Sequence, residues 1–300
     1  MRRDARSGRA ARLGWCAGQA LLPPPGLYIT AVGSGAHFTK WYTQWNDSIS
    51  ASGGTLVGSL AALYVYDTQV LGGSVASMFS TGAGRLCLKL APATERTCSR
   101  GMEDSYADVI SWARLFSLRT DDETKSESSI PYGLAVRLSL GLQMPTGAYD
   151  DNKPVNNGAN FWDIAPSLAV TYNTKSLLGP KLGQATEFSA RAFYHAYTKN
   201  QATNYLTGDV VSIDFAATQR LDSWQFGLSG YAFAQIEDDT KNGIKIRDNR
   251  ASTVILGPIA SYGFFAGGRS WTAGIKTGFS VAGSHTGAVN AVILRLTTKL

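Results

Sequence analysis

Apolar and polar side chains alternate along seven or more stretches of this chain, and the clearest stretch covers residues 132–144. The even-numbered positions there are apolar: one tyrosine, then aliphatic residues, then a methionine. They are Tyr132, Leu134, Val136, Leu138, Leu140, Leu142 and Met144. The other parity is small, polar or charged. A period of two predicts a strand with two chemically different faces. Because the pattern repeats to the last residue, it is typical of an outer-membrane β-barrel, with lipid outside and a wet lumen inside.

The alternation predicts about 12 strands, an even number as in bacterial barrels. From residue 130 onward the predicted strands are 132–144, 162–172, 187–195, 211–216, 224–229, 253–264, 271–280 and 292–300. Weaker strands are expected from Leu27 and over 54–66, 70–81 and 105–117, with long loops at 34–53 and 82–103 and a short turn at Asp67-Thr68. The prediction is an all-β, antiparallel, up-and-down transmembrane β-barrel over residues 26–300, after an irregular N-terminal segment, 1–25.

Three features do not fit a simple barrel pattern. In the stretch 105–117 the parity is ambiguous, because Asp108 and Arg114 share a face with Ile110. Pro166 and Pro258 fall on lipid-facing positions, where proline cannot donate to a ladder, so we expect β-bulges or different strand limits. Residues 118–129 and 174–184 are longer than periplasmic turns should be, although loop lengths mostly alternate as expected with both termini in the periplasm.

Composition and charge narrow the class of protein. Charged residues make up 17% of the 300-residue chain, below the roughly 25% of soluble domains. No apolar run approaches the ~18 residues of a membrane helix.

Five arginines against one aspartate in the first twelve residues supply most of the net charge of +6, so the rest of the chain offers no nucleic-acid-binding face. That cluster indicates either a targeting segment or a start codon assigned in the wrong place. No apolar region of about 7–15 residues follows it, so no signal peptide is visible and the second interpretation is favoured.

The cysteines leave one question open and indicate no metal site. Cys87 and Cys98 share one predicted loop and either form a disulfide in an oxidising compartment or remain free thiols. Cys16 is a poor lipoprotein cysteine because it follows the bulky Trp15. No Cys/His spacing resembles a zinc site. We therefore expect no metal and no cofactor.

Several short motifs, in order along the chain, carry a family resemblance. They are Pro23-Pro24-Pro25-Gly26-Leu27-Tyr28, Met144-Pro145-Thr146-Gly147-Ala148-Tyr149, Asn157-Gly158-Ala159-Asn160-Phe161-Trp162, Ala165-Pro166-Ser167-Leu168-Ala169, Tyr205-Leu206-Thr207-Gly208-Asp209 followed by Asp214, Gln235-Ile236-Glu237-Asp238-Asp239 and Leu256-Gly257-Pro258. The sequence resembles, over most of residues 22–300, the family named for the MetA pathway of phenol degradation. The resemblance implies an outer-membrane β-barrel linked with breakdown of aromatic compounds and assumed to aid their uptake. It also implies that Pro166 and Pro258 are tolerated, and it brings no established catalytic residues.

Charged residues on the lumen parity are the candidate functional residues: Arg137, Asp163, Glu187, Arg191, His195, Asp214, Lys276 and Arg295. They either line a solute path and set its selectivity or pair across strands and fill a narrow barrel. Tyr197, Tyr231 and Phe233 also have inward parity. These rings either stack against an aromatic solute, or a bulge near Gly230 turns the last two toward lipid, and the bulge is the favoured interpretation.

Two other kinds of site are weighed. Asp238, Asp239 and Asp248 with Glu237, and Asp150 with Asp151 and Asn152, suggest calcium ligands, but the lack of regular spacing favours solvated acidic loops. A barrel lipase would need Ser and His on the outer face of one strand. His195 has inward parity, and the adjacent Ser284 and His285 point opposite ways. We therefore predict no catalytic residues and no enzyme.

The sequence thus predicts a barrel in a Gram-negative outer membrane that allows passive uptake of small hydrophobic or aromatic compounds. Its expected partners are the lipid bilayer, such solutes and the barrel-assembly machinery, and not nucleic acid. No extensive plug domain is expected, although a short N-terminal segment has room to enter the lumen. A structural or adhesive barrel without transport is the alternative function.

Overall fold

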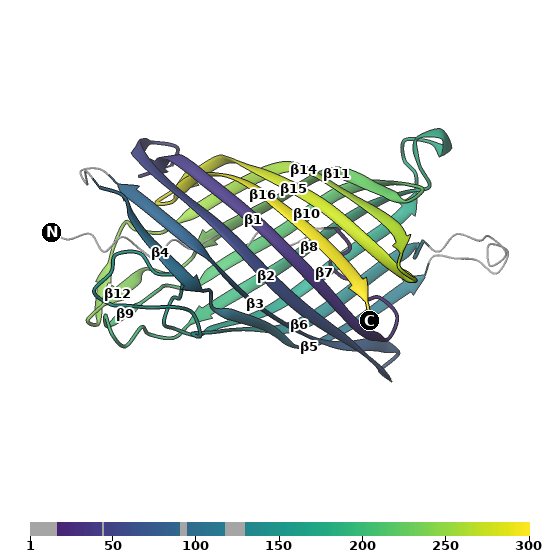
Figure 1. Ribbon diagram of the computed structural model, residues 1–300, viewed down its shortest axis with the longest axis horizontal. Helices are drawn as coiled ribbons and strands as arrows, with labels where there is room; N and C mark the ends of the chain where they lie inside the picture. Colours follow the sequence, from purple (N-terminus) through teal and green to yellow (C-terminus); the bar gives the residue numbers. More distant parts are fainter. Residues whose placement is uncertain (1–16, 44, 91–94, 118–129) are drawn as a thin grey trace.

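Twelve antiparallel strands pair with their neighbours in chain order, and β1 pairs with both β2 and β16, so the sheet closes on itself. The computed structural model describes residues 17–43, 45–90, 95–117 and 130–300, and its strands lie tilted around the barrel (Figure 1). The barrel strands are β1 (Gly26–Tyr42), β2 (Ser48–Val70), β3 (Gly73–Leu90), β5 (Ser105–Ser117), β6 (Gly133–Met144), β7 (Asp163–Lys175), β8 (Ala185–Tyr197), β10 (Val210–Leu221), β11 (Trp224–Gln235), β14 (Ser252–Ala266), β15 (Arg269–Ser284) and β16 (Gly287–Lys299). The predicted fold class is confirmed.

The two ends of the barrel differ. Residues 145–162, 198–209 and 236–251 connect strands at one end, the long-loop end, which lies to the left in Figure 1. There β4 (Thr97–Met102) pairs with β3, while β9 (Tyr205–Leu206), β12 (Asp239–Lys241) and β13 (Ile244–Ile246) form a separate small sheet. The other end, the short-turn end, holds the C-terminus and tight turns such as 71–72 and 267–268, with a 3₁₀ turn, η2 (Pro180–Leu182), in the longer connection after β7. Long extracellular loops and short periplasmic turns are the rule for such barrels.

Burial alternates along the strands as the sequence pattern predicts. In β7 the residues alternate strictly between buried and exposed over most of the strand. The exposed side chains are apolar and form the outer face, among them Leu138, Leu168, Ile213, Leu228, Leu256 and Leu294. Lipid tails would cover this face, which explains why large apolar side chains stand outside the wall. Among the described residues, no helix is long and apolar enough to cross a membrane.

The predicted long loops at 34–53 and 82–103 are wrong. β1 runs to Tyr42, β2 starts at Ser48, and β3 continues to Leu90 before β4. The outward positions there include Gly35, His37 and Arg85, so these segments lack a regular apolar half of the alternation although the backbone is extended. The turn after β2 is Leu71-Gly72 rather than Asp67-Thr68, and both residues have the positive φ that suits a tight hairpin.

A β-bulge resolves the ambiguous parity of β5. Its register against β6 shifts between Asp108 and Ile110, and an extra residue in one strand reverses the parity that follows. Asp108 therefore faces the lumen and is buried, whereas Ile110 and Arg114 face outward and are exposed.

Each proline interrupts a ladder on one side only. Pro166 pairs with Leu140 of β6, but the β7–β8 ladder is broken around it and resumes in the same register. Pro258 likewise pairs with Leu228, while the β14–β15 ladder is broken beside it. The strands therefore continue through both prolines without an inserted residue, so neither expected solution, a bulge or a shifted strand limit, is correct.

Candidate solute path in the barrel lumen

The eight candidate residues all lie on the lumen side of the barrel wall. They come from β6 (Arg137), β7 (Asp163), β8 (Glu187, Arg191, His195), β10 (Asp214), β15 (Lys276) and β16 (Arg295). Five of them are less than a tenth exposed, and Glu187 is completely buried: Asp163, Glu187, Arg191, Asp214 and Lys276. Their placement agrees with the parity prediction, and their role in a solute path is a separate question.

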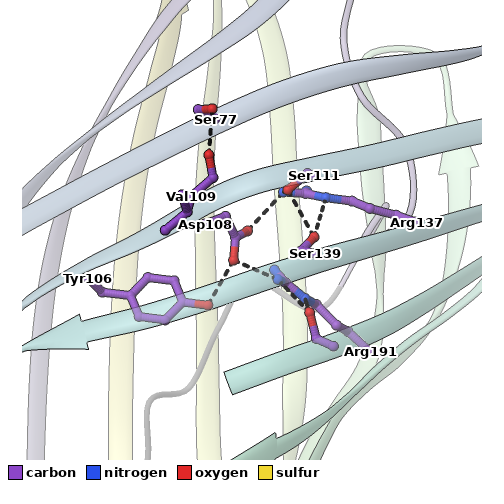
Figure 2. Close-up of polar contacts among 9 residues, drawn as sticks. Ser77, Tyr106, Asp108, Val109, Ser111, Arg137, Ser139 and Arg191 are labelled. Atoms are coloured by element: carbon purple, nitrogen blue, oxygen red, sulfur yellow. Dashed lines mark hydrogen bonds and ion pairs between the residues drawn. The ribbon is translucent and has the colours of Figure 1, made fainter. Parts of the chain in front are cut away.

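Asp108 lies between two arginines and contacts both of them (Figure 2). Its Oδ2 accepts from Arg137 Nη2 at 2.8 Å, and its Oδ1 accepts from Arg191 Nη2 at 2.8 Å and from the Tyr106 hydroxyl at 2.8 Å. Each guanidinium group also donates to a serine hydroxyl, Arg137 to Ser139 and Arg191 to Ser167. One buried carboxylate therefore orients two cations, and charge-assisted bonds of this kind are strong. We call Tyr106, Asp108, Arg137 and Arg191 the Asp108 cluster.

Three further candidates, Glu187, Asp214 and Lys276, also lie near groups of opposite sign. Glu187 accepts from Arg220 Nη2 at 3.0 Å, and Lys276 Nζ lies 3.8 Å from Asp214 Oδ1. The second pair joins β10 and β15, which are separated in the sheet by β11 and β14. Charges of both signs thus meet across the lumen, as the pairing interpretation expects.

Alternate side chains of β8 form a column of π faces that begins at the long-loop end. Tyr197 stacks on His195 at 6.2 Å between ring centroids, and His195 stacks on Phe193 at 5.7 Å. Phe161 meets Tyr197 edge-on, and the Arg191 guanidinium carbon lies 4.5 Å from the Phe193 ring centre. We call Tyr197, His195, Phe193 and Arg191 the β8 column. It runs from the rim of the barrel to the Asp108 cluster.

Tyr231 and Phe233 face the lumen, so the favoured prediction of a bulge near Gly230 is wrong. The β10–β11 ladder is continuous through this region. Both rings are buried, and they pack with Val210, Ala251 and Ile255. Gly230 instead faces outward beneath the Phe215 ring, where a Cβ atom would come within 2.2 Å of that ring.

Asp163, His195 and Ser212 contact one another in the order found in serine hydrolases. His195 Nδ1 lies 2.9 Å from Asp163 Oδ2, and His195 Nε2 lies 3.0 Å from Ser212 Oγ. Ser212 sits within β10 and is paired in the ladders with β8 and β11 on both sides. The backbone N–H groups around it are therefore part of the sheet, whereas acyl transfer needs free donors aimed at the developing oxyanion. The arrangement fits a positioned histidine better than a catalytic one.

A short N-terminal segment, residues 17–22, lies inside the lumen between the Asp108 cluster and the short-turn end. Its backbone N–H groups donate to lumen side chains: Gly18 to Glu187 Oε1 at 2.7 Å, Gln19 to Ser189 Oγ at 2.9 Å, and Ala20 to Thr171 Oγ1 at 3.0 Å. Ala20 packs against two inward alanines of β6 and β7. The Arg-rich first twelve residues and Cys16 lie outside the described residues.

The motifs that carry the family resemblance are structural in the loops. Asp104 accepts from the backbone N–H groups of Gly147 and Ala159 and from Gln143 Nε2, at 2.8–2.9 Å. Asp239, which is fully buried, accepts from the Tyr205 hydroxyl, from Gly208 N–H at 3.0 Å and from Gln235 Nε2 at 2.6 Å. A buried carboxylate with three donors fixes its neighbours in place. Both motifs therefore anchor long loops.

The acidic loop residues and the cysteines also have defined partners. Asp238 pairs with Arg250 at 2.7 Å, and that hydrogen bond lowers the pKa of the Asp238 carboxyl. Asp150 accepts from the Asn152 N–H, which lowers the pKa of Asp150. No group of three or more candidate metal-ligating side chains occurs in the described part of the chain. Cys87 and Cys98 form a disulfide between β3 and β4, so of the two alternatives, a disulfide or free thiols, the disulfide is correct.

A closed antiparallel barrel with an apolar outer face and a polar lumen defines an outer-membrane β-barrel protein. The family described as "Putative MetA-pathway of phenol degradation" matches residues 41–296. The chain belongs to this family, which confirms the resemblance seen in the sequence. No curated protein matches the sequence.

Several solved structures are similar to this chain at low sequence identity. The COG4313 outer membrane channel from Pseudomonas putida F1 is 15% identical with a TM-score of 0.76, over 96% of this chain and 100% of that chain. The translocator domain of the autotransporter NalP from Neisseria meningitidis is 11% identical with a TM-score of 0.47, over 91% of this chain and 88% of that one. The first similarity supports the twelve-stranded barrel fold.

Sequence reasoning missed three of the residues that organise the lumen. The bulge in β5 hides the inward side of Tyr106 and Asp108, and Ser212 is a small polar residue of the predicted strand 211–216. The signal for Asp108 was present, since a carboxylate among apolar positions of a lipid-facing strand indicates either a bulge or a wrong parity. No comparable signal marked Ser212.

Proposed function

We propose that this protein is a passive outer-membrane channel for small hydrophobic or aromatic solutes. The observation that carries the proposal is the β8 column, which presents Tyr197, His195 and Phe193 to the lumen from the rim inward. Tyr231 and Phe233 add further rings on the lumen face. Aromatic faces interact favourably with other rings by offset or edge-to-face contact. The eight charged candidates would line this path and set its selectivity. In this proposal residues 26–300 are the single barrel domain and residues 1–25 are a segment that precedes it.

Membership of a family described by phenol degradation supports the same proposal. The lipid bilayer would contact the outer face, and the barrel-assembly machinery would insert the chain. Aromatic solutes would enter at the long-loop end and diffuse along the lumen without an energy source.

Swelling of proteoliposomes with a panel of aromatic compounds and sugars tests the channel. We expect faster entry of small aromatic solutes than of sugars of similar size. Empty liposomes and liposomes that contain heat-denatured protein are the controls. If no solute enters faster than in the empty liposomes, the channel proposal is wrong.

The second candidate function is a structural barrel without transport. Two observations favour it: the charged residues pair with one another, and residues 17–22 occupy part of the lumen. It predicts no flux for any solute, both for the wild-type protein and for variants in which residues 17–22 are released. Bilayer conductance of the two proteins separates the candidates.

A further inference from the structure

The Asp108 cluster, at the inner end of the β8 column, combines an excess of positive charge with an aromatic surface. We propose that it is a binding site for arenes that carry an anionic group, with carboxylates such as benzoate as the simplest examples. This proposal rests on the channel function and deepens it by naming the substrate class.

The charges of the cluster do not cancel. Arg137 and Arg191 share one carboxylate, that of Asp108. Asp214 lies within electrostatic reach of Arg191, but Lys276 Nζ is 3.8 Å from Asp214. Together with Lys276 and Asp214, the cluster thus has three cations against two carboxylates, while the next carboxylate along the β8 column, Asp163, contacts His195. The local excess of positive charge beside the two arginines favours an anion over a cation.

The two arginines also retain hydrogen-bonding capacity. Arg137 uses Nε and Nη2 on Ser139, Ser111 and Asp108. Arg191 uses Nε and Nη2 on Ser167 and Asp108. In the described part of the chain, Nη1 of neither arginine donates to a side chain, and both side chains keep some exposure, at 11% and 9%. A planar guanidinium group with two such donors suits a carboxylate.

The neighbouring ring supplies the aromatic half of the site. The Phe193 ring covers one face of the Arg191 guanidinium, at 4.5 Å from its carbon, and His195 and Tyr197 continue the stack toward the rim. A solute whose carboxylate reaches Arg191 therefore places an attached ring beside the edges of Phe193 and His195. A bare inorganic anion would gain the charge contact without the ring contact, and a neutral arene would gain only the ring contact.

Equilibrium binding to the full chain, folded in detergent and followed by isothermal titration calorimetry, tests this site independently of transport. The probes are benzoate, cyclohexanecarboxylate, benzyl alcohol and benzylamine. We expect benzoate to bind most tightly and benzylamine not to bind. Arg191→Gln should weaken benzoate binding by about tenfold or more, since it removes a charge-assisted hydrogen bond. Phe193→Leu should weaken it by about two- to tenfold.

Matched variants control for indirect effects. Arg250→Gln removes an arginine in a long loop, and Phe188→Leu makes the same change on the outer face of β8. Both should bind benzoate as the wild-type protein does. Arg191→Lys, which keeps the charge, should fall between the wild type and Arg191→Gln. Folding of every variant is checked by the heat-dependent gel shift, and Arg137→Gln replaces Arg191→Gln if the latter does not fold.

The outcomes separate the two proposals. Equal benzoate affinity in folded Arg191→Gln or Arg137→Gln, equal affinity for benzoate and benzylamine, or no benzoate binding by the wild-type protein would each overturn the site, even if solutes still cross the barrel. Arginine-dependent benzoate binding without flux of any solute would support the site and contradict the channel.

Discussion

The two sides of the lumen wall differ in chemistry although they belong to one continuous sheet. The polar wall, made by β5, β6, β7, β8 and β10, turns inward mainly charged and hydroxyl side chains: Asp108, Ser111, Arg137, Ser139, Asp163, Ser167, Thr171, Glu187, Ser189, Arg191, Ser212 and Asp214. The apolar wall, made by β14, β16, β2 and β3, turns inward mainly small or aliphatic ones: Ile255, Ile259, Ala291, Ile293, Val65 and Ala76. Polar residues also occur on this side, among them Thr253 on β14, Arg295 on β16 and Lys276 on β15, which lies between these two strands.

The difference indicates how each wall keeps its shape. Polar-wall side chains are fixed by hydrogen bonds and ion pairs to partners on adjacent or nearby strands, so each depends on a particular neighbour. Apolar-wall side chains are fixed by packing, which is less directional. A solute between the walls would meet charge and aromatic rings on one side and aliphatic groups on the other. Four predictions test this contrast, from the largest expected effect to the smallest.

Loss of the Asp108 carboxylate should have the largest effect. Asp108→Ala leaves Arg137 and Arg191 close together without the carboxylate they share, and breaking a buried pair costs about 3–5 kcal/mol. We expect the free energy of unfolding in urea to fall by this amount, or the barrel not to assemble. The triple variant Asp108→Ala, Arg137→Met, Arg191→Met removes the uncompensated charges and should recover part of the loss. A single variant as stable as the wild type would mean that the polar wall does not depend on its ion pairs.

Release of residues 17–22 should follow from removing the hydroxyl groups that hold them. In the double variant Thr171→Val, Ser189→Ala, the N–H groups of Gln19 and Ala20 lose their acceptors, at a cost of about 1–3 kcal/mol for each buried donor left unsatisfied. The segment should leave the lumen, and single-channel conductance in planar bilayers should rise.

A matched hydroxyl pair elsewhere in the lumen provides the control for that experiment. Thr30 and Thr297 bond to each other at 2.9 Å on β1 and β16, away from the segment. Their replacement by valine should leave conductance unchanged. Equal conductance in both double variants would show that residues 17–22 do not limit passage.

Trimming the apolar wall should have a moderate effect. Ile255→Val removes one methylene group from a fully buried side chain, and such changes cost about 0.5–1.5 kcal/mol. Urea unfolding should show this loss while benzoate binding is retained. If Ile255→Val lowered the free energy of unfolding as much as Asp108→Ala is expected to, the view that the apolar wall depends on non-directional packing would be contradicted.

The exposed pair Asp238–Arg250 should have the smallest effect. Because the hydrogen bond lowers the pKa of Asp238 in the folded protein, its stabilising contribution is present above the pKa of the unfolded carboxyl and is lost as the pH falls through the lowered folded value. Resistance of this loop to limited proteolysis should therefore decrease slightly on acidification, and Asp238→Asn should abolish the dependence. A dependence that persists in Asp238→Asn would assign it to another group.

Much of the fold follows from local pattern, as β6 and β7 show. Their outward Leu138 and Leu168 and inward Arg137 and Ser167 repeat with a period of two, and a period of two fixes which side chains share a face. The same reasoning failed in β1 and β2, where outward glycines carry no hydropathy signal, and in β5, where a bulge reversed the parity. The structure also corrected the orientation of Tyr231 and Phe233, because a continuous ladder is a property of two strands and not of one.

By itself the sequence predicted a barrel of about twelve strands and the inward side of eight charged residues, though not of Asp108, because alternation along a strand needs only neighbouring residues. Its short motifs indicated the family. Only the tertiary structure decided which of those charges meet. Asp108 joins Arg137 and Arg191, Lys276 reaches Asp214 across two strands, and residues 17–22 enter the lumen beside Glu187. Such contacts depend on register, bulges and barrel closure, which bring together residues that are distant in sequence.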